Sequence, residues 1–456
     1  MNLLDLLYLP AAAVTAPWWA RKTRSGWGER FGRIEQIPPK RPGTPRILLH
    51  AVSVGEVNTL RSLVPLLRER GCEVVVSVST DTGLKRAREI IAPSPSAFVT
   101  RYPLDFSPAV RRFLDAISPD LVALVELEVW PNFVRACRER EVPIGVINGR
   151  LSARSFRGYR RIRPLLRKTF ASLAFVGAQD APYAERFRAM GVQPDRLTIT
   201  GSMKWDALDT PTLRGGVLSL PPDLLAKASQ LARDLGVNPS LPLIVAGSTA
   251  PLSPPVRIGG QPIDCEEALL HAACPPNVQL LCAPRKPEHY ERAFAALGGA
   301  GRCVRRSARI ADSSSASARP TRFLLDTIGE LRAAYALADI AVVGRTWGNL
   351  GGSDPIESIA LGKPTVQGPR FANFETIVRA FIDADAIAIA EAGDLPRTFR
   401  TLLDDATLRA ELPARGLACI ESHKGATARH ADLILRALPQ RVEIKSTRGA
   451  LHGSPA

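Results

Sequence analysis

Short apolar runs alternate with helical patterns along most of the chain. In the first half, strands are predicted at residues 47–50, 74–79, 121–126, 144–148, 175–179 and 197–201. Leucines at helical spacing follow the first of these runs, and helices are also predicted at residues 108–117 and 133–139. Strands that are apolar on both faces and are connected through helices are typical of a parallel, doubly wound sheet.

A second set of the same kind occupies the other half of the chain. Its strands are predicted at residues 243–246, 278–282, 340–343 and 365–367. The two sets are separated by a linker, near residues 205–240, that is rich in Pro and Leu and partly helical. Residues 253–260 are predicted to be an insertion of Pro and Gly, and residues 307–319 to be a surface loop.

The length of the chain also favours two domains, since 456 residues are too many for one ordinary core. We therefore expect an α/β protein with a Rossmann-like domain at residues 21–208 and a second one at residues 209–440. A disordered tail is expected at residues 441–456. Between two such domains, the expected ligand site is the cleft, at the carboxyl ends of the strands.

Residues 1–20 differ from the rest because nearly all of them are apolar, and Arg and Lys follow them directly. A cleaved signal peptide would carry its basic residues before the apolar core. We predict a membrane anchor, either a short span or an interfacial helix, with the following domains on the cytoplasmic side. The alternative is a first helix that docks on the protein's own core.

The net charge of +16 predicts attraction to anionic partners, namely nucleic acid, anionic membranes or phosphorylated substrates. Nucleic acid is not expected as a partner, because no nucleic-acid-binding motif occurs and aromatic residues make up only 6% of the chain. The seven cysteines are scattered and form no CxxC pair, which argues against a disulfide scaffold or a zinc site.

The turn after the first predicted strand carries one candidate catalytic residue. Ser53 and Gly55 form a small-residue turn, and Glu56 lies near the start of the following helix. A carboxylate there could be a general base. It could also be a helix-start acid that interacts with the positive end of the helix dipole, and the pattern leaves both interpretations open.

Two further strand ends in the first half carry charged residues. Glu126 and Glu128 would share one face if their strand continued, and two such close carboxylates tend to raise one pKa or to recruit a cation. Each could instead be a structural acid bonded to backbone amides. After residues 144–148 the chain is dense in arginines, whose guanidinium groups can each donate two parallel hydrogen bonds to a phosphate. The alternative is that these arginines form a solvated helix face.

The second half offers groups that suit a phosphate. Gly247, Ser248 and Thr249 close the first strand of this half and provide amides and hydroxyls. Pro284 and Arg285 begin a cationic loop after the next strand.

A glycine-rich stretch is the most informative part of the second half. Gly351 and Gly352 allow close approach to a ligand, and Ser353 or Asp354 is expected to cap the next helix. Glu357, on the first turn of that helix, fits a ribose diol. These features predict a nucleotide-sugar site. Nucleotide hydrolysis is not expected, because no phosphate-binding P-loop motif is present.

The order of these motifs, from about residue 1 to 437, resembles that of the Kdo (3-deoxy-D-manno-octulosonic acid) transferases of lipid A assembly. The matching segments are residues 27–32, 50–56, 126–132, 150–155, 158–161, 201–206, 246–249, 326–330, 351–357, 362–364 and 373–374. The resemblance implies an inverting glycosyltransferase of GT-B type, with two Rossmann-like domains facing across a cleft.

The resemblance also implies partners and roles. CMP-Kdo would be the donor substrate, with no metal or cofactor, and a phosphorylated lipid A precursor (lipid IVA) the acceptor, at the cytoplasmic side of the inner membrane. Glu56 matches the general base and Glu357 the acid that holds the CMP ribose. The expected acceptor-binding residues are Ser53, Gly55, Glu126, Glu128, Arg150, Arg154, Arg157, Arg160 and Arg161. The expected donor-binding residues are Lys204, Gly247, Ser248, Thr249, Pro284, Arg285, Gly351, Gly352, Ser353, Asp354, Glu357 and Asn373.

Four positions, in three segments, depart from the usual pattern of this family. The family often has His-Asn in place of Ser353 and Asp354, His in place of Lys286, and Ala in place of Gly149. These departures concern the expected donor contacts and leave the fold prediction unchanged. Two alternatives stay open, namely another GT-B enzyme (a UDP-sugar transferase or an epimerase) and a non-catalytic protein that binds anionic lipid.

Overall fold

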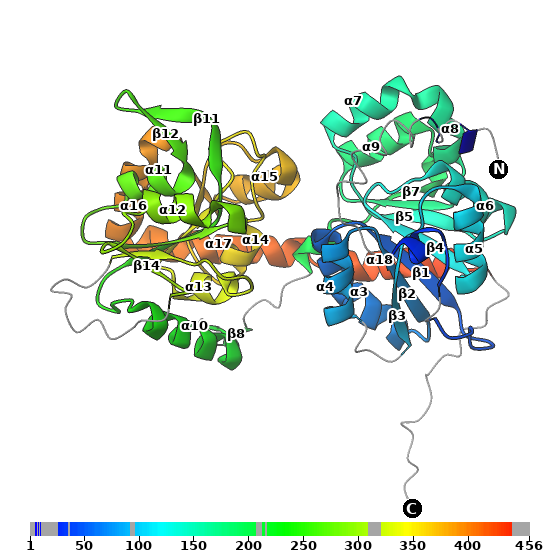
Figure 1. The fold of residues 1–456 in the computed structure, drawn as a ribbon, viewed down its shortest axis with the longest axis horizontal. Helices are drawn as coiled ribbons and strands as arrows, with labels where there is room; N and C mark the ends of the chain where they lie inside the picture. Colours follow the sequence, from blue (N-terminus) through cyan, green and yellow to red (C-terminus); the bar gives the residue numbers. More distant parts are fainter. Residues whose placement is uncertain are drawn as a thin grey trace, which may run out of the picture. The chain divides into compact units, whose positions relative to one another are not determined.

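The computed structural model describes residues 26–34, 37–91, 96–206, 212–214, 217–308 and 321–439, together with Asp5, Leu6, Tyr8 and Pro10. The chain divides into two compact units. The first unit comprises Met1–Ala207 and His423–Ala456, and the second comprises Leu208–Ser422. Within the described residues, each unit is built on a seven-stranded parallel sheet with helices on both faces (Figure 1).

The first sheet has the strand order β3-β2-β1-β4-β5-β6-β7, and all its described pairings are parallel. Its strands are β1 (Arg46–Ala51), β2 (Glu73–Val78), β3 (Ala97–Arg101), β4 (Leu121–Val125), β5 (Ile144–Gly149), β6 (Phe175–Ala178) and β7 (Leu197–Ile199). The predicted parallel sheet is confirmed. The hydrophobic pattern missed β3, an edge strand that is only partly buried and ends in Thr and Arg.

The helices of the first unit cover both faces of this sheet. They are α2 (Trp27–Arg30), α3 (Val54–Glu69), α4 (Asp81–Ile90), α5 (Ser107–Ile117), α6 (Pro131–Glu139), α7 (Ala153–Arg161), α8 (Arg163–Ala171), α9 (Ala181–Met190) and α18 (Ala426–Arg436), with short 3-10 turns η1 (Pro194–Arg196) and η2 (Met203–Trp205).

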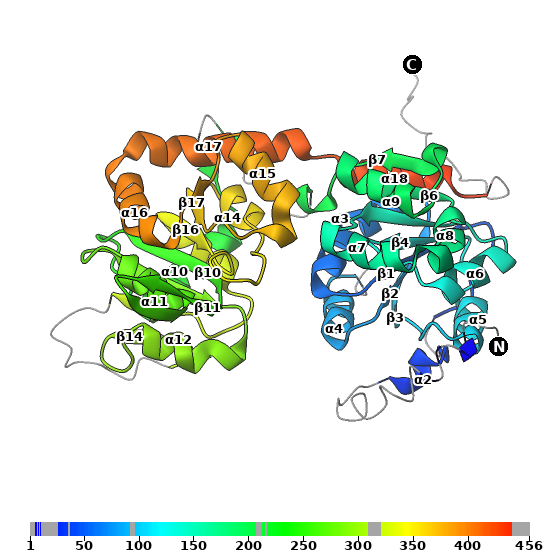
Figure 2. The same cartoon turned by 90° about the horizontal axis from the view of Figure 1, so that it is seen from above.

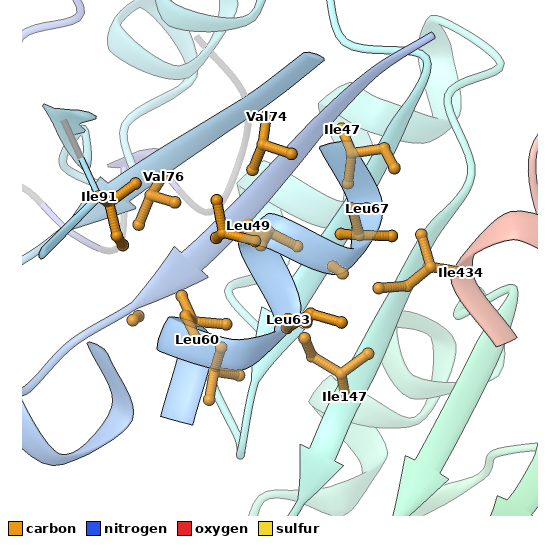
Figure 3. Packing of buried hydrophobic residues seen from close by; sticks show 14 of the residues in the cluster. Ile47, Leu49, Leu60, Leu63, Leu67, Val74, Val76, Ile91, Ile147 and Ile434 are labelled. Carbon is orange, nitrogen blue, oxygen red and sulfur yellow. The ribbon is translucent and has the colours of Figure 1, made fainter. Parts of the chain in front are cut away.

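Side chains along β1 alternate between two apolar cores, as the pleat of a strand requires. Ile47 and Leu49 enter one core, where Figure 3 shows them with Leu63 of α3 and Ile434 of α18. Leu48 enters the other core, with residues of α5, α6, α8 and α9. Burial on both faces makes β1 a rigid base for the loop that follows it.

The second sheet has the order β14-β15-β13-β10-β16-β17-β18 and is also parallel. Its strands are β10 (Leu243–Thr249), β13 (Gln279–Pro284), β14 (Cys303–Arg305), β15 (Arg322–Leu324), β16 (Ile340–Val343), β17 (Thr365–Gln367) and β18 (Ala388–Ile389). Its helices are α10 (Pro222–Leu235), α11 (Glu266–Ala273), α12 (Tyr290–Ala296), α13 (Leu331–Leu337), α14 (Ile356–Ala360), α15 (Glu375–Asp383), α16 (Leu395–Asp404) and α17 (Ala406–His423), with 3-10 turns η3 (Pro287–His289), η4 (Ala372–Phe374) and η5 (Ala392–Asp394).

Two antiparallel ribbons accompany the second sheet. One pairs β8 (Thr212–Arg214) with β9 (Val217–Ser219). The other pairs β11 (Pro251–Ile258) with β12 (Gln261–Cys265). The insertion expected at residues 253–260 therefore forms most of a β-hairpin between β10 and α11, a strand pairing that the sequence pattern did not predict. Gly259 and Gly260, both at positive φ, form the two-residue turn of a hairpin.

The C-terminal helix α18 belongs to the first unit, whereas the sequence pattern placed residues up to 440 in the second domain. Ala431 and Ile434 lie in the core beside α3, and His430 Nε2 accepts a hydrogen bond from Asn148 N–H at 3.2 Å. Figure 2 shows α18, in red, among elements of the first unit. Helical periodicity identifies the apolar face of α18 but not the sheet that it covers.

Of residues 1–20, the structure describes four, and two of these dock on the first unit. Asp5 is buried, and its Oδ1 accepts hydrogen bonds from Ser107 N–H at 3.0 Å and Asn132 Nδ2 at 3.1 Å. The Tyr8 hydroxyl donates to Asp105 Oδ2 at 3.0 Å. These contacts agree with the docked-helix alternative for this part of the segment, and the predicted anchor gains no support.

Within the described residues, the helices are too short or too polar to cross a membrane. Most of the predicted anchor at residues 1–20 lies outside the described residues. The same holds for residues 309–319 of the expected surface loop and for the expected tail at residues 441–456.

Candidate functional site

Glu56 occupies the first turn of α3, directly beyond the carboxyl end of β1. Ser53 is the N-cap residue of α3, and its hydroxyl accepts from Glu56 N–H at 3.4 Å and donates to Glu56 Oε1 at 2.8 Å. Val52 N–H donates to Glu56 Oε2 at 2.8 Å. This reciprocal capping fixes the carboxylate in one orientation, and each oxygen keeps a lone pair for a further donor.

The pKa of the Glu56 carboxyl group is raised to about 7. Burial is the largest cause and the negative charge of Glu126 adds to it, whereas the hydrogen bonds from Val52 and Ser53 oppose both effects. A base with a pKa near 7 both holds and releases a proton readily at neutral pH. The two interpretations of Glu56 are therefore compatible, because one carboxylate caps the helix and has the pKa of a base.

Glu126 lies at the carboxyl end of β4, the strand next to β1. Its φ of 60° turns the chain away from the strand direction, so Glu126 and Glu128 do not share a strand face as expected for a continuing strand. Its backbone is bonded to the neighbouring strand end, since Glu126 N–H donates to Ile147 O at 3.0 Å and Arg150 N–H donates to Glu126 O at 3.3 Å. The Arg150 guanidinium lies 3.9 Å from Glu126 Oε2.

Glu128 belongs to the same group of carboxylates. Its Oε2 accepts a hydrogen bond from Trp130 Nε1 at 2.9 Å. Burial raises the pKa of Glu128, the bond from Trp130 lowers it, and the charge of Glu126 raises it. The structure thus brings Glu56, Glu126, Glu128 and Arg150 together at the carboxyl ends of β1, β4 and β5.

The remaining predicted arginines lie on α7, which starts at the N-cap residue Ser152. Burial followed by the charge of Glu128 raises the pKa of Tyr159, so α7 borders the carboxylates. The arginine side chains themselves are exposed and form no ion pair with the described residues: these are Arg154, Arg157, Arg160 and Arg161. The structure therefore makes them a cationic surface beside Glu128 and gives them no direct contact with Glu56.

Tyr335 packs closely against the turn that ends β10. A Cβ atom at Gly247 would overlap the Tyr335 hydroxyl, so only glycine fits there. Ser248 adopts a φ of 58°. The Thr249 hydroxyl donates to Glu267 Oε1 at 2.5 Å, and Thr249 O accepts from Arg285 N–H at 2.9 Å. This turn is thereby joined to Pro284, the last residue of β13, and to the cationic loop after it.

Glu266 is a functional candidate that the sequence did not reveal. Its buried carboxylate accepts hydrogen bonds from four backbone amides: Ala250 at 3.1 Å, Arg345 at 2.6 Å, Thr346 at 2.9 Å and Trp347 at 3.3 Å. It ties the loop after β16 to the turn after β10. In the sequence it is indistinguishable from an ordinary helix-start acid of α11, because three of its four partners lie about eighty positions away.

Asn373 is hydrogen-bonded to the glycine-rich loop. Gly351 and Gly352 have φ values of 76° and 86°. Asn373 N–H donates to Gly351 O, and Asn373 Nδ2 donates to Leu350 O, both at 2.9 Å. Asn373 thus has a structural task in this loop, and its predicted donor contact stays a prediction.

The residues after these glycines lie around the start of α14. The N-cap residue of α14 is Pro355, not Ser353 or Asp354 as expected, although Asp354 Oδ1 accepts a hydrogen bond from Ile356 N–H, in the first turn, at 3.1 Å. The Ser353 hydroxyl is buried and has no hydrogen-bond partner among the described residues. Burial raises the pKa of Glu357, which Arg332 opposes and Asp354 reinforces. Lys204, the remaining expected donor-binding residue, lies in η2 of the first unit.

Both units thus end their central strands in polar loops at the carboxyl edge of a parallel sheet. In the described part of the chain, no group of three or more His, Cys, Asp and Glu side chains could hold a metal ion. Two parallel-sheet α/β units in succession define a protein of the GT-B class, as predicted. A solved glycosyltransferase from Rickettsia africae shares this fold with a TM-score of 0.56, at 11% identity, over 87% of this chain and 99% of that one.

Sequence comparison identifies the family. Residues 25–207 match the model of the 3-deoxy-D-manno-octulosonic-acid transferase (kdotransferase) family. The 3-deoxy-D-manno-octulosonic acid transferase of Bordetella pertussis is 33% identical over 432 residues, which cover 92% of this chain and 94% of that protein. The corresponding protein of Haemophilus influenzae is 28% identical, over 94% of this chain and 95% of its own. The chain belongs to this family of glycosyltransferases, and the resemblance seen in the sequence is confirmed.

Proposed function

We propose that this glycosyltransferase moves Kdo from CMP-Kdo to a hydroxyl of a phosphorylated lipid A precursor. The observation that carries the proposal is Glu56, a partly buried carboxylate with a pKa of about 7, held at a strand end by Ser53 and Val52. The names of the relatives supply the sugar. The precursor is proposed because the edge beside Glu56 is flanked by the exposed arginines of α7, which suit phosphates.

In this mechanism, the acceptor hydroxyl attacks the anomeric carbon of Kdo. The new carbon–oxygen bond forms as the bond from that carbon to the CMP phosphate breaks, with inversion at the carbon. Glu56 takes the hydroxyl proton, and CMP leaves with the bonding electron pair. Because Glu56 is oriented by two hydrogen bonds before substrate arrives, little reorganisation accompanies proton transfer.

We place the donor on the second unit. The turn at Ser248 and Thr249 and the cation of Arg285 suit the phosphate, and Glu357 suits the ribose hydroxyls. Amides and guanidinium groups would then stabilise the charge that develops on the leaving CMP. We accordingly propose that transfer needs no metal ion.

We also propose that the protein works at the cytoplasmic side of the inner membrane, because its acceptor is a lipid. The net charge of +16 supports attraction to an anionic surface. Binding to vesicles with and without an anionic phospholipid tests this part of the proposal. Equal binding to both vesicle types, or none to either, would contradict it.

The decisive experiment is incubation with CMP-Kdo and a tetra-acylated, bis-phosphorylated glucosamine disaccharide, followed by mass measurement of the lipid product. We expect Kdo addition with CMP release, and unchanged activity after treatment with EDTA. Parallel reactions with UDP-sugars should give no product. Transfer from a UDP-sugar instead of CMP-Kdo would overturn the donor assignment.

A further inference from the structure

Arg345 follows β16 at the carboxyl edge of the second sheet and has no role in the function proposed above. Its backbone is fixed on both sides. Its N–H donates to Glu266 Oε2 at 2.6 Å, and its carbonyl oxygen accepts from Gly352 N–H at 2.8 Å. Arg345 therefore lies where the turn after β10 and the glycine-rich loop are joined.

Arg285 lies close to Arg345, although the two residues come from different strands. β13, which precedes Arg285, and β16, which precedes Arg345, flank β10 on opposite sides. The backbone of Arg285 is bonded to Thr249 O. Burial and the positive charge of Arg285 lower the pKa of Arg345. Two arginines thus follow the strands on either side of β10, and the charge of one acts on the other.

Neither guanidinium of the pair lies within 4 Å of a carboxylate oxygen in the described part of the protein. The charge of Glu266 acts on Arg345 and partly offsets the effect of Arg285, but the oxygens of Glu266 are hydrogen-bonded to backbone amides. Arg345 is half-buried, and its Nη2 donates a hydrogen bond of 3.4 Å to Leu350 O. Like charges that are partly buried beside each other repel, so such a pair is stabilised by an anion.

Two buried polar groups without hydrogen-bond partners among the residues described lie near the carboxyl edge of the second sheet. The Ser353 hydroxyl, in a residue that is 9% exposed, has no partner among the described residues. Ser353 directly follows Gly352, whose N–H donates a hydrogen bond to Arg345 O. The side-chain amide of Gln367 is also buried without a partner in the described structure, at the carboxyl end of β17 beside β16. Buried polar groups normally have partners, so these atoms support a polar ligand at this edge.

We propose that Arg345 is a further donor-binding residue that, together with Arg285, holds the anionic groups of a nucleotide-linked sugar acid. This inference rests on the proposed function. A CMP-linked sugar acid carries two anions, the phosphate and the sugar carboxylate, and each fits a guanidinium fork. Arg345 would thereby favour sugar acids over neutral sugars with the same nucleotide.

The backbone of Arg345 makes an informative substitution possible. Its φ of 64° is strained for any residue with a side chain and natural for glycine. Arg345→Gly therefore removes the guanidinium group while it relieves the backbone, and the variant should melt no earlier than the wild-type protein. Arg345→Lys keeps the charge without the fork, and Arg400→Ala, at an exposed position of α16, is the matched control.

The test measures the KM for CMP-Kdo and the affinities for CMP and for cytidine, in the full-length wild-type protein and in these variants. For Arg345→Gly we expect the donor KM to rise about tenfold to a hundredfold, with an intermediate rise for Arg345→Lys and none for Arg400→Ala. Cytidine affinity should not change. A parallel loss of CMP affinity assigns Arg345 to the phosphate, and a loss confined to CMP-Kdo assigns it to the sugar carboxylate.

Two results separate this inference from the proposed function. If the wild-type protein transfers Kdo, while Arg345→Gly keeps its donor KM and CMP affinity within about twofold, the role of Arg345 is overturned. If the wild-type protein transfers no Kdo, yet Arg345→Gly loses CMP affinity, the anion site stands and the proposed activity falls.

Discussion

The two sheets have the same plan but carry different charged groups at their carboxyl edges. In each unit the first central strand, β1 or β10, is followed by a tight turn, and a non-glycine residue at positive φ follows the strand beside it. That residue is Glu126 in the first unit, directly after β4, with φ 60°, and Arg345 in the second, two residues after β16, with φ 64°. The same backbone conformation therefore positions an acidic residue in one unit and a basic residue in the other.

The two edges also differ in the surroundings of a glutamate, which is partly buried in the first unit and fully buried in the second. Burial raises the pKa of both Glu56 and Glu266 to about 7. Glu56 accepts one amide and one hydroxyl hydrogen bond, whereas Glu266 accepts four amides and is fully buried. A raised pKa therefore does not mark a general base by itself, and the number of lone pairs left for substrate separates the two residues.

The largest effect should come from Glu56→Gln. The amide keeps the size of the side chain but cannot accept the acceptor proton, so we expect kcat to fall about 10²–10⁴-fold. CMP affinity, measured by calorimetry, should stay at the wild-type level because the donor is proposed to bind the other unit. A kcat within about tenfold of the wild-type value would remove Glu56 from the role of base.

Glu266→Ala should instead act on stability. Several buried amides would lose their acceptor at a cost of about 1–3 kcal/mol each, so we expect the free energy of unfolding to fall by at least about 3 kcal/mol. Urea unfolding measures this change. The exposed Glu375→Ala on α15 is the control and should change stability by less than about 0.5 kcal/mol. Equal effects of the two substitutions would argue against a structural role for Glu266.

A smaller contrast concerns the glycines in the two turns. Ala at Gly247 would overlap the Tyr335 hydroxyl, whereas the nearest atom to a Cβ at Gly55 is Ser53 Oγ at 3.7 Å. We expect Gly247→Ala to cost about 1–3 kcal/mol through overpacking. Gly55→Ala, in the first turn of a helix, should change stability by less than about 1 kcal/mol. Thermal unfolding of both variants tests the contrast, and a Gly247→Ala variant as stable as Gly55→Ala would contradict the packing of the turn.

The smallest effect should be a shift in pH dependence. The negative charge of Glu126 raises the pKa of Glu56, so Glu126→Gln should lower it. Because the base acts in its ionised form, kcat/KM should fall as the pH drops below about 7 in the wild-type protein. In Glu126→Gln this acid limb should move to lower pH. A profile that moves to higher pH, or that does not move, would show that Glu126 does not act on Glu56 through its charge.

Much of the fold could be predicted because it depends on local pattern. Continuous apolar runs identified the central strands, and their helical connections predicted parallel sheets. The interpretation failed where composition misled it, as at β11, whose prolines hid a strand. It also failed at α18, since an apolar helix face does not identify the sheet on which it packs.

The sequence by itself determined the position of Glu56 after β1, the glycine-rich loop before α14 and the family of the protein, because each depends on residues that are close in the chain or in a fixed order. Only the tertiary structure decided that Glu266 is hydrogen-bonded to the loop after β16 and that the charge of Arg285 acts on Arg345. It also decided that Glu126 raises the pKa of Glu56. These properties arise from hydrogen bonds and charge interactions between residues that are distant in sequence, so no local sequence pattern predicts them.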